Sequence, residues 1–173
     1  RLASLIPSRD TRRPASNAPQ EATLRRLRET IATAEEQWNR FCAGSATALS
    51  AFVEQTRHSA QLATQLEHPD LNRLAQTLTA AANWLAQQPS RQSDSVAMEI
   101  ATALLLIQTA LEHYSHLGQD FPEQVDLMVK RLHTCMAGET PADADVPLLD
   151  EMSRRAQERL LMAQVAREIQ SNL

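Results

Sequence analysis

The sequence predicts an all-α protein, an antiparallel helical bundle of about five to six helices. Apolar residues recur every three to four positions along most of the chain, which is the period of an amphipathic helix. Glycine occurs only three times in 173 residues, and runs of strand-forming residues are very few. With 43% hydrophobic residues but only 3% aromatic ones, one domain with a core of Leu, Ala, Ile, Val and Met is expected.

The chain is expected to begin with a linker over residues 1–19. This segment carries Pro7, Pro14 and Pro19 among Ser and Arg, and it has too little apolar surface to fold by itself. The helical period starts at about residue 20. The first predicted helix then continues to Gly44, because glycine is the residue that most readily ends a helix.

The next two helices are predicted over about 45–67 and 70–87. The second helix closes at His68 and Pro69, because the residue before proline resists helical geometry. The third helix stops near Pro89. Connections of only a few residues favour antiparallel neighbours, and hence an up-and-down bundle.

The fourth predicted helix, capped by Ser93 or Asp94 and ending at Gly118, is apolar around most of its circumference. Between Val96 and Tyr114 it has thirteen apolar and six polar residues. Its longest unbroken apolar run is Ala103–Ile107, far short of the roughly 18 residues that a membrane span needs. It is therefore interpreted as the central helix of the bundle, and no membrane span is expected.

A fifth helix over about 121–137 ends at Gly138 and completes a bundle domain over 20–138. An acidic, proline-bounded loop over 139–146 follows, and a C-terminal helix runs over 147–173.

The C-terminal helix carries apolar residues on two nearly opposite faces. Its first half places one set on one face: Met152, Ala156, Leu160 and Ala163. Its second half places another set opposite: Leu161, Met162, Val165, Ile169 and Leu173. A helix packed on a single core keeps one apolar stripe. We therefore expect this helix to pack on the bundle at its start, and at its end on the next domain of a longer parent chain or on a second copy as a homodimer.

Composition and charge favour a cytoplasmic protein that does not bind nucleic acid. The net charge of −4 is opposite to the cationic surface that nucleic-acid binding requires. Two separated cysteines, Cys42 and Cys135, are expected to be reduced, and no signal peptide is visible. Because the chain starts without methionine and stops within a helical pattern, it is expected to be part of a longer protein.

Known site chemistries find no matching pattern, so neither a cofactor nor a metal is expected. None of the five histidines has glutamate three residues earlier, as a di-iron bundle requires. The three glycines are isolated, which excludes a glycine-rich phosphate loop, and no signature of an activated nucleophile is present. A weak one-helix metal site at Glu112, His113 and His116 is outweighed by the interpretation that these residues line the wet end of the fourth helix.

One histidine is a candidate phosphoacceptor. In histidine phosphotransfer domains an exposed histidine is typically followed by lysine at +3 and glycine at +4. His58 lies in the middle of a predicted helix, but Gln61 and Leu62 occupy these two positions. We therefore interpret His58 as a surface or boundary residue, with phosphotransfer as the alternative.

Two stretches resemble a known family. "MEIATALLLIQTALEHYSHLGQDFPEQVDLMVKRL" (98–132) and "LLDEMSRRAQERLLMAQVAREIQSNL" (148–173) are similar to the N-terminal region of the CheA-like hybrid histidine kinases of type IV pilus chemotaxis systems, the ChpA/PilL family. The related scaffold protein FimL shares this region. The two stretches cover about a third of the chain and carry no catalytic motif.

The resemblance implies a parent histidine kinase that controls twitching motility by two-component phosphorelay. This segment would be a non-catalytic, phosphotransfer-like scaffold, without enzyme activity of its own. Its implied partners are a response regulator or a polar-localisation scaffold protein, and its implied place is the cytoplasm, at the cell pole. The alternatives are a stand-alone scaffold like FimL and a degenerate but active phosphotransfer domain that uses His58.

Overall fold

The computed structural model describes residues 2–138 and 147–172, with side chains over 18–138 and 151–165, and these residues form helices connected by short turns. The elements in chain order are α1 (Leu2–Cys42), α2 (Ala48–Thr64), α3 (Pro69–Gln87), a 3₁₀ turn (Pro89–Arg91), α4 (Asp94–Glu112), a second 3₁₀ turn (Tyr114–His116), α5 (Phe121–Met136) and α6 (Pro147–Asn172). The described chain contains no strand, so the predicted all-α class is confirmed.

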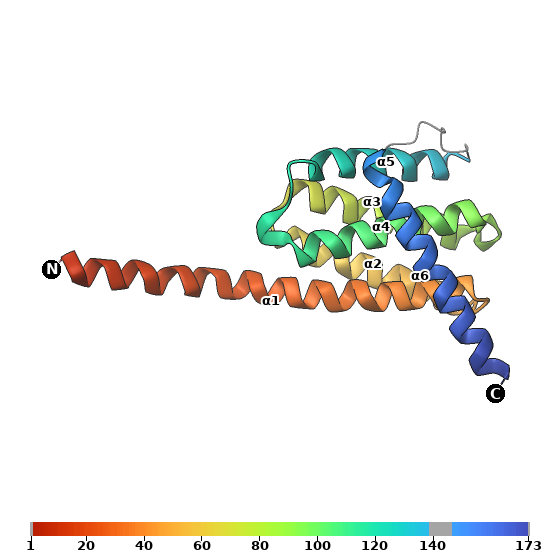
Figure 1. Cartoon of the computed structure of the whole chain (residues 1–173), viewed down its shortest axis with the longest axis horizontal. Coiled ribbons are helices and arrows are strands. Elements are labelled where there is room, and N and C mark those ends of the chain that lie inside the picture. The colour runs from red at the N-terminus through yellow and green to blue at the C-terminus, as the bar shows by residue number, and fades with distance from the viewer. Residues whose placement is uncertain (1, 139–146, 173) are drawn as a thin grey trace.

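Helices α1 to α5 lie side by side in the bundle, and α6 crosses them obliquely (Figure 1). Consecutive helices pack in pairs from α1 to α3, and α3 also packs against α5. Helix α4 contacts α1, α3, α5 and α6, which makes it the central helix, as predicted.

Helix α4 is central because its side chains are apolar in nearly every direction. Twelve of its residues are buried, and Ala103, Leu104 and Leu111 have no exposed surface. By length and composition alone, α4 is the one helix in the described residues that passes the test for a membrane span, but 67% of the tested stretch is buried inside the bundle. Its apolar surface is thus used for packing against the neighbouring helices.

Aromatic packing joins α1 to α2 at one end of the core. The ring centroids of Trp38 and Phe52 are 4.9 Å apart, and both side chains are completely buried. Large aromatic side chains contribute more buried area than any other residue type. These two residues therefore fix how the first two helices meet in an otherwise aliphatic core.

The helix boundaries follow local signals. Ser93 caps α4, because its hydroxyl oxygen accepts a hydrogen bond from the backbone N–H of Val96 at 3.2 Å. Gly44 ends the turn after α1 with φ +113°, a backbone conformation that favours glycine. Helix α4 ends at Glu112 and not at the predicted Gly118. The chain turns there because Tyr114 packs toward the core, and its hydroxyl donates to the carbonyl of Leu66 at 3.2 Å.

The predicted linker over 1–19 differs from the structure, in which α1 is continuous from Leu2. The prediction depended on three prolines, which lack the N–H that a helix interior uses. Extending a helix that is already packed, here over 24–41, costs less than starting a new one, because nucleation is the expensive step. The first part of α1 projects beyond the rest of the bundle (Figure 1). The loop predicted over 139–146 lies outside the described residues.

Candidate functional site

The first half of α6 packs on the bundle, as the sequence predicted. The helix runs from α5 across α4 to α1, and its end extends past α1 (Figure 1). Ala156 and Leu160 are buried, and Met152 and Ala163 are half-buried. Burial of one leucine contributes about 1.5–3 kcal/mol, so apolar packing holds the described part of α6 only modestly.

A polar cluster joins α6 to α1 and α4. Arg159 Nη2 lies 2.6 Å from Glu35 Oε1, and its Nη1 donates to Gln108 Oε1 at 2.9 Å. Gln108 Nε2 also donates to Glu35 Oε1, at 3.0 Å. Each of the three side chains therefore contacts the other two, and we call this arrangement the Arg159 cluster. It connects three helices at one point on the surface of the bundle.

A second polar contact is buried between α4 and α5. Glu99 is 2% exposed, and its carboxylate forms an ion pair with the Arg131 guanidinium, with 2.7 Å between Oε1 and Nη2. Arg131 Nε donates to the other oxygen, Oε2, at 3.2 Å. The Nη2 contact does not meet the directional geometry of a hydrogen bond, so Oε1 is held by charge alone. The ion pair with Arg131 explains how the charged residue Glu99 can be buried in the central helix.

The two cysteines are free thiols in half-buried positions. Burial raises the pKa of Cys42 to about 12, although its hydrogen bond with Gln92 acts in the opposite direction. Burial also raises the pKa of Cys135, and the negative charge of Glu99 raises it further. A thiol reacts as the thiolate, so neither cysteine is suited to nucleophilic catalysis at neutral pH.

Close packing between α4 and the described beginning of α6 is interrupted on one side, although Met152 there packs against the core cluster. A groove of about 440 Å³ lies there and is lined by Met98 of α4 and by Glu151, Ser153, Arg154 and Gln157 of α6. The hydroxyl oxygen of Ser153 is buried without a hydrogen-bond partner in the described structure. Protein interiors are normally close-packed and their buried polar groups are paired, so this end of the α6 contact is incomplete.

The outer face of α6 carries exposed apolar side chains. Leu161 is 52% exposed, Met162 71% and Val165 51%. We call these three residues the outer strip. They lie on the face that the sequence predicted to point away from the bundle, while Ile169 and Leu173 of the same set lie outside the described side chains. Large exposed apolar residues that gather on one helix face are typical of contact surfaces.

His58, the candidate phosphoacceptor, is exposed on α2. One turn before it, Glu54 forms an ion pair with Arg57. One turn after it are Gln61, which is exposed, and Leu62, which is buried. By helical spacing, the residues one turn from His58 are therefore a carboxylate that is already paired with Arg57, an amide and a buried leucine, and neither lysine nor glycine occupies the two positions typical of a phosphotransfer histidine.

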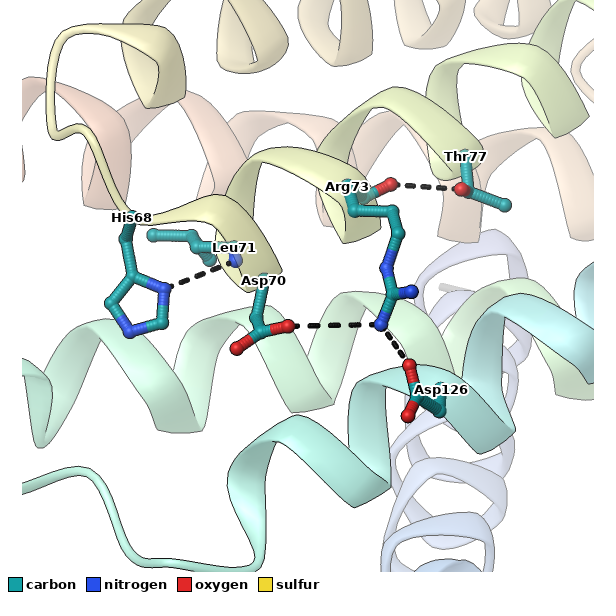
Figure 2. A network of polar contacts seen from close by, with 6 residues as sticks. All are labelled: His68, Asp70, Leu71, Arg73, Thr77 and Asp126. Carbon is teal, nitrogen blue, oxygen red and sulfur yellow. Dashed lines mark hydrogen bonds and ion pairs between the residues drawn. The ribbon is translucent and has the colours of Figure 1, made fainter.

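His68 has a structural role at the start of α3. Its Nδ1 accepts a hydrogen bond from the backbone N–H of Leu71 at 3.4 Å, as Figure 2 shows. Its ring packs edge-on against Phe121 and at a tilt to Tyr114, with centroid distances of 5.6 and 5.9 Å. The side chain thus caps α3 and joins it to the turn before α5. The remaining three histidines are all exposed: His113, His116 and His133.

Figure 2 also shows the polar contact between α3 and α5. The guanidinium of Arg73 pairs with Asp126 across the two helices and lies 3.7 Å from Asp70 on its own helix. Arg73 and Asp126 are 47% and 63% exposed, and ion pairs with this exposure contribute little to stability. We interpret this network as one that orients α5 on α3.

Among the described residues, no three or more potential metal ligands lie close enough together to hold a metal ion. The candidate set of Glu112, His113 and His116 therefore does not form such a group. Comparisons with protein-family models, with curated proteins and with solved structures found no match.

Sequence reasoning did not find the residues that fix α6. The Arg159 cluster joins positions 73 and 51 residues apart, and no local pattern connects them. The one signal in the sequence that could have pointed to these contacts was the presence of polar residues within an otherwise apolar fourth helix. Gln108 and Glu99 are two of these residues, and both have charged partners on other helices.

Proposed function

We propose that this chain is a non-catalytic, phosphotransfer-like interaction module of a CheA-like hybrid histidine kinase that acts in a type IV pilus chemotaxis system. The resemblance of residues 98–132 and 148–173 to that family motivates the assignment to a two-component phosphorelay. The proposed partners are a response regulator or a polar scaffold protein, in the cytoplasm at the cell pole. A stand-alone scaffold like FimL is the related alternative.

The observation that carries the non-catalytic part of the proposal is the surroundings of the histidines. His68 uses its Nδ1 as a helix cap, and His58 has Glu54 and Gln61 as its helical neighbours. A phosphorylated His58 would lie one turn from the Glu54 carboxylate, whose neighbouring cation, Arg57, is already engaged in an ion pair with it. A bundle with such histidines supports binding and spacing roles over phosphoryl transfer.

A phosphotransfer assay tests this proposal. The chain is incubated with a response regulator that carries radiolabelled aspartyl phosphate, and acid-labile, base-stable phosphate on the chain is measured. We expect no label. Labelling that is lost in His58→Gln and kept in His133→Gln would establish the degenerate phosphotransfer domain in its place. Both residues are exposed, so both variants are expected to fold.

A second candidate function is self-association through the outer strip. It is favoured by the exposure of Leu161, Met162 and Val165 on one face of α6. Sedimentation of the chain over a hundredfold range of concentration tests it. A dimer that dissociates in Met162→Glu, but not in the exposed control Gln157→Glu, supports this function. A monomer at every concentration would rule it out.

A further inference from the structure

We propose that α6 is a displaceable strap, which opens from the face of α4 while the bundle of α1 to α5 stays folded. In the closed state α6 lies across α4, from α5 to α1 (Figure 1). The inference concerns the folding of this chain alone. It does not depend on the signalling role proposed above.

The bundle core is nearly complete without α6. The main cluster of buried apolar residues takes Leu160 from the described part of α6, and its other members come from α1 to α5 and from Leu66 in the turn between α2 and α3. Met152 packs against the edge of that cluster. Each of α1 to α5 contributes several residues, whereas lifting the described part of α6 (151–165) removes one member of the cluster, Leu160. Elements with few buried apolar contacts are the ones that open independently.

Among the described residues, the interhelical polar contacts of α6 are concentrated at one point, although α6 also lies along α4 over an extended contact. The Arg159 cluster supplies its interhelical ion pair among the described residues, and the Arg159 side chain is 47% exposed. Beside Met98 a groove interrupts the packing of α6 on α4, and within the described structure the hydroxyl of Ser153 has no hydrogen-bond partner. Arg159, which solvent can reach, thus supplies the polar attachment of α6, and the groove beside Met98 interrupts the packing of the same helix on α4.

Leu105 marks the surface that the strap covers. On the α4 helical wheel it lies between Met98, which borders the groove with α6, and Gln108, which bonds to Arg159. Leu105 is 4% exposed, yet it does not belong to the main core cluster. Its neighbour Leu104 does belong to that cluster and is completely buried. Opening of α6 therefore uncovers Leu105 and leaves Leu104 enclosed.

Native-state hydrogen exchange of the full chain tests the strap without any substitution. We expect amides of 152–163 to exchange at least tenfold faster than amides of α4, with rates that change little at low denaturant. Exchange of 152–163 at the rate of α4, with the same denaturant dependence, would mean that α6 unfolds only with the whole bundle. That result would overturn the proposal.

Removal of the single cation then tests the latch. Arg159→Met should speed exchange of 152–163 by about five- to tenfold, because a charge-assisted contact is lost, and should leave α2 and α3 unchanged. Arg155→Met, on the exposed side of the same helix, is the matched control and should have no effect. Equal acceleration of all helices in Arg159→Met would contradict a local opening.

Thiol trapping reports directly on the covered surface. In a chain with Cys42→Ala and Cys135→Ala, Leu105→Cys should be labelled at least tenfold faster than Leu104→Cys under native conditions. Addition of Arg159→Met should raise only the rate at position 105. Equal labelling rates at positions 104 and 105 would overturn the proposal. If either cysteine variant does not fold, the hydrogen-exchange experiment decides whether α6 opens independently of the bundle.

Discussion

Glu99 of α4 and Arg131 of α5 form an ion pair, with 2.7 Å between Oε1 and Nη2, although the Glu99 side chain is only 2% exposed to solvent. A carboxylate in that position would be strongly destabilising without a cation, because burial removes its hydration. Arg131 keeps 26% of its side chain exposed. It therefore neutralises the buried carboxylate while part of its own side chain stays in contact with water. The pair also fixes which face of α5 meets α4.

Removal of one partner of this pair should be costly. Arg131→Met leaves the Glu99 carboxylate buried and unpaired, and we expect a loss of about 2–4 kcal/mol in the free energy of unfolding. Urea titration followed by circular dichroism measures this loss. The double variant Glu99→Met/Arg131→Met should lose less than the sum of the two single variants, because it leaves no unpaired charge.

The matched control for that prediction is Arg40→Met. Arg40 forms an ion pair with Glu36 on the surface of α1, where both side chains are more than half exposed. Its loss should change stability by less than about 1 kcal/mol. A similar loss for Arg40→Met and Arg131→Met would contradict a special role for the buried pair.

Truncation of the central helix should be among the most destabilising changes. Leu104→Ala removes a completely buried side chain from α4, and we expect a loss of about 2–5 kcal/mol. Leu161→Ala makes the same chemical change on the outer face of α6, where the side chain is 52% exposed, and should alter stability by less than about 0.5 kcal/mol. Thermal or urea unfolding of both variants would show whether α4 is the core helix. Similar losses for the two would refute that assignment.

The cap at His68 should be replaceable by another good cap. His68→Ala removes the acceptor for the Leu71 N–H together with the aromatic contacts, and should cost about 1–2 kcal/mol. His68→Asn should recover part of this loss, because asparagine is among the best N-cap residues. Denaturant midpoints of the three proteins provide the measurement. Equal midpoints for the Ala and Asn variants would show that packing on Phe121, and not capping, accounts for the effect.

The Cys42 thiol should be slow to react throughout the neutral range. Its pKa is raised to about 12 by burial, so the thiolate fraction should rise about tenfold for each pH unit up to pH 10 without levelling off. Rates of alkylation by iodoacetamide, measured in a Cys135→Ala background, check this. In urea the same rate should level off near pH 9, the ordinary range of a free thiol. A plateau below pH 10 in the folded protein would show that Cys42 is more accessible than its burial indicates.

The same shift has a consequence for stability at high pH. Below pH 9 the Cys42 thiol is protonated in both the folded and the unfolded chain, so it has no pH effect there. Between about pH 9 and 12 the unfolded chain ionises this thiol and the folded chain does not, so stability should fall as pH rises. Cys42→Ala should therefore show a smaller loss of stability over that window, measured by urea titration at pH 8, 9 and 10.

Much of the secondary structure could be predicted from the sequence. The period of apolar residues located all six helices, the Ser93 cap was correctly identified as one of two candidates, and α4 was correctly predicted to be central. The two faces of α6 were also predicted, and the exposure of Leu161, Met162 and Val165 agrees with that prediction. The continuation of α1 over 2–19 was missed, because proline is a strong local signal and propagation from an already packed helix is not visible in a local pattern.

The sequence by itself determined the existence and order of the helices, the Ser93 cap as one of two candidates and the faces on which apolar side chains gather, because these depend on neighbours within one or two turns of the chain. Only the tertiary structure decided which face meets which helix. It brought Glu35, Gln108 and Arg159 together and paired Glu99 with Arg131. These contacts join residues on separate helices, and polar partners of this kind are selected by the three-dimensional packing of the bundle and not by any period in the sequence.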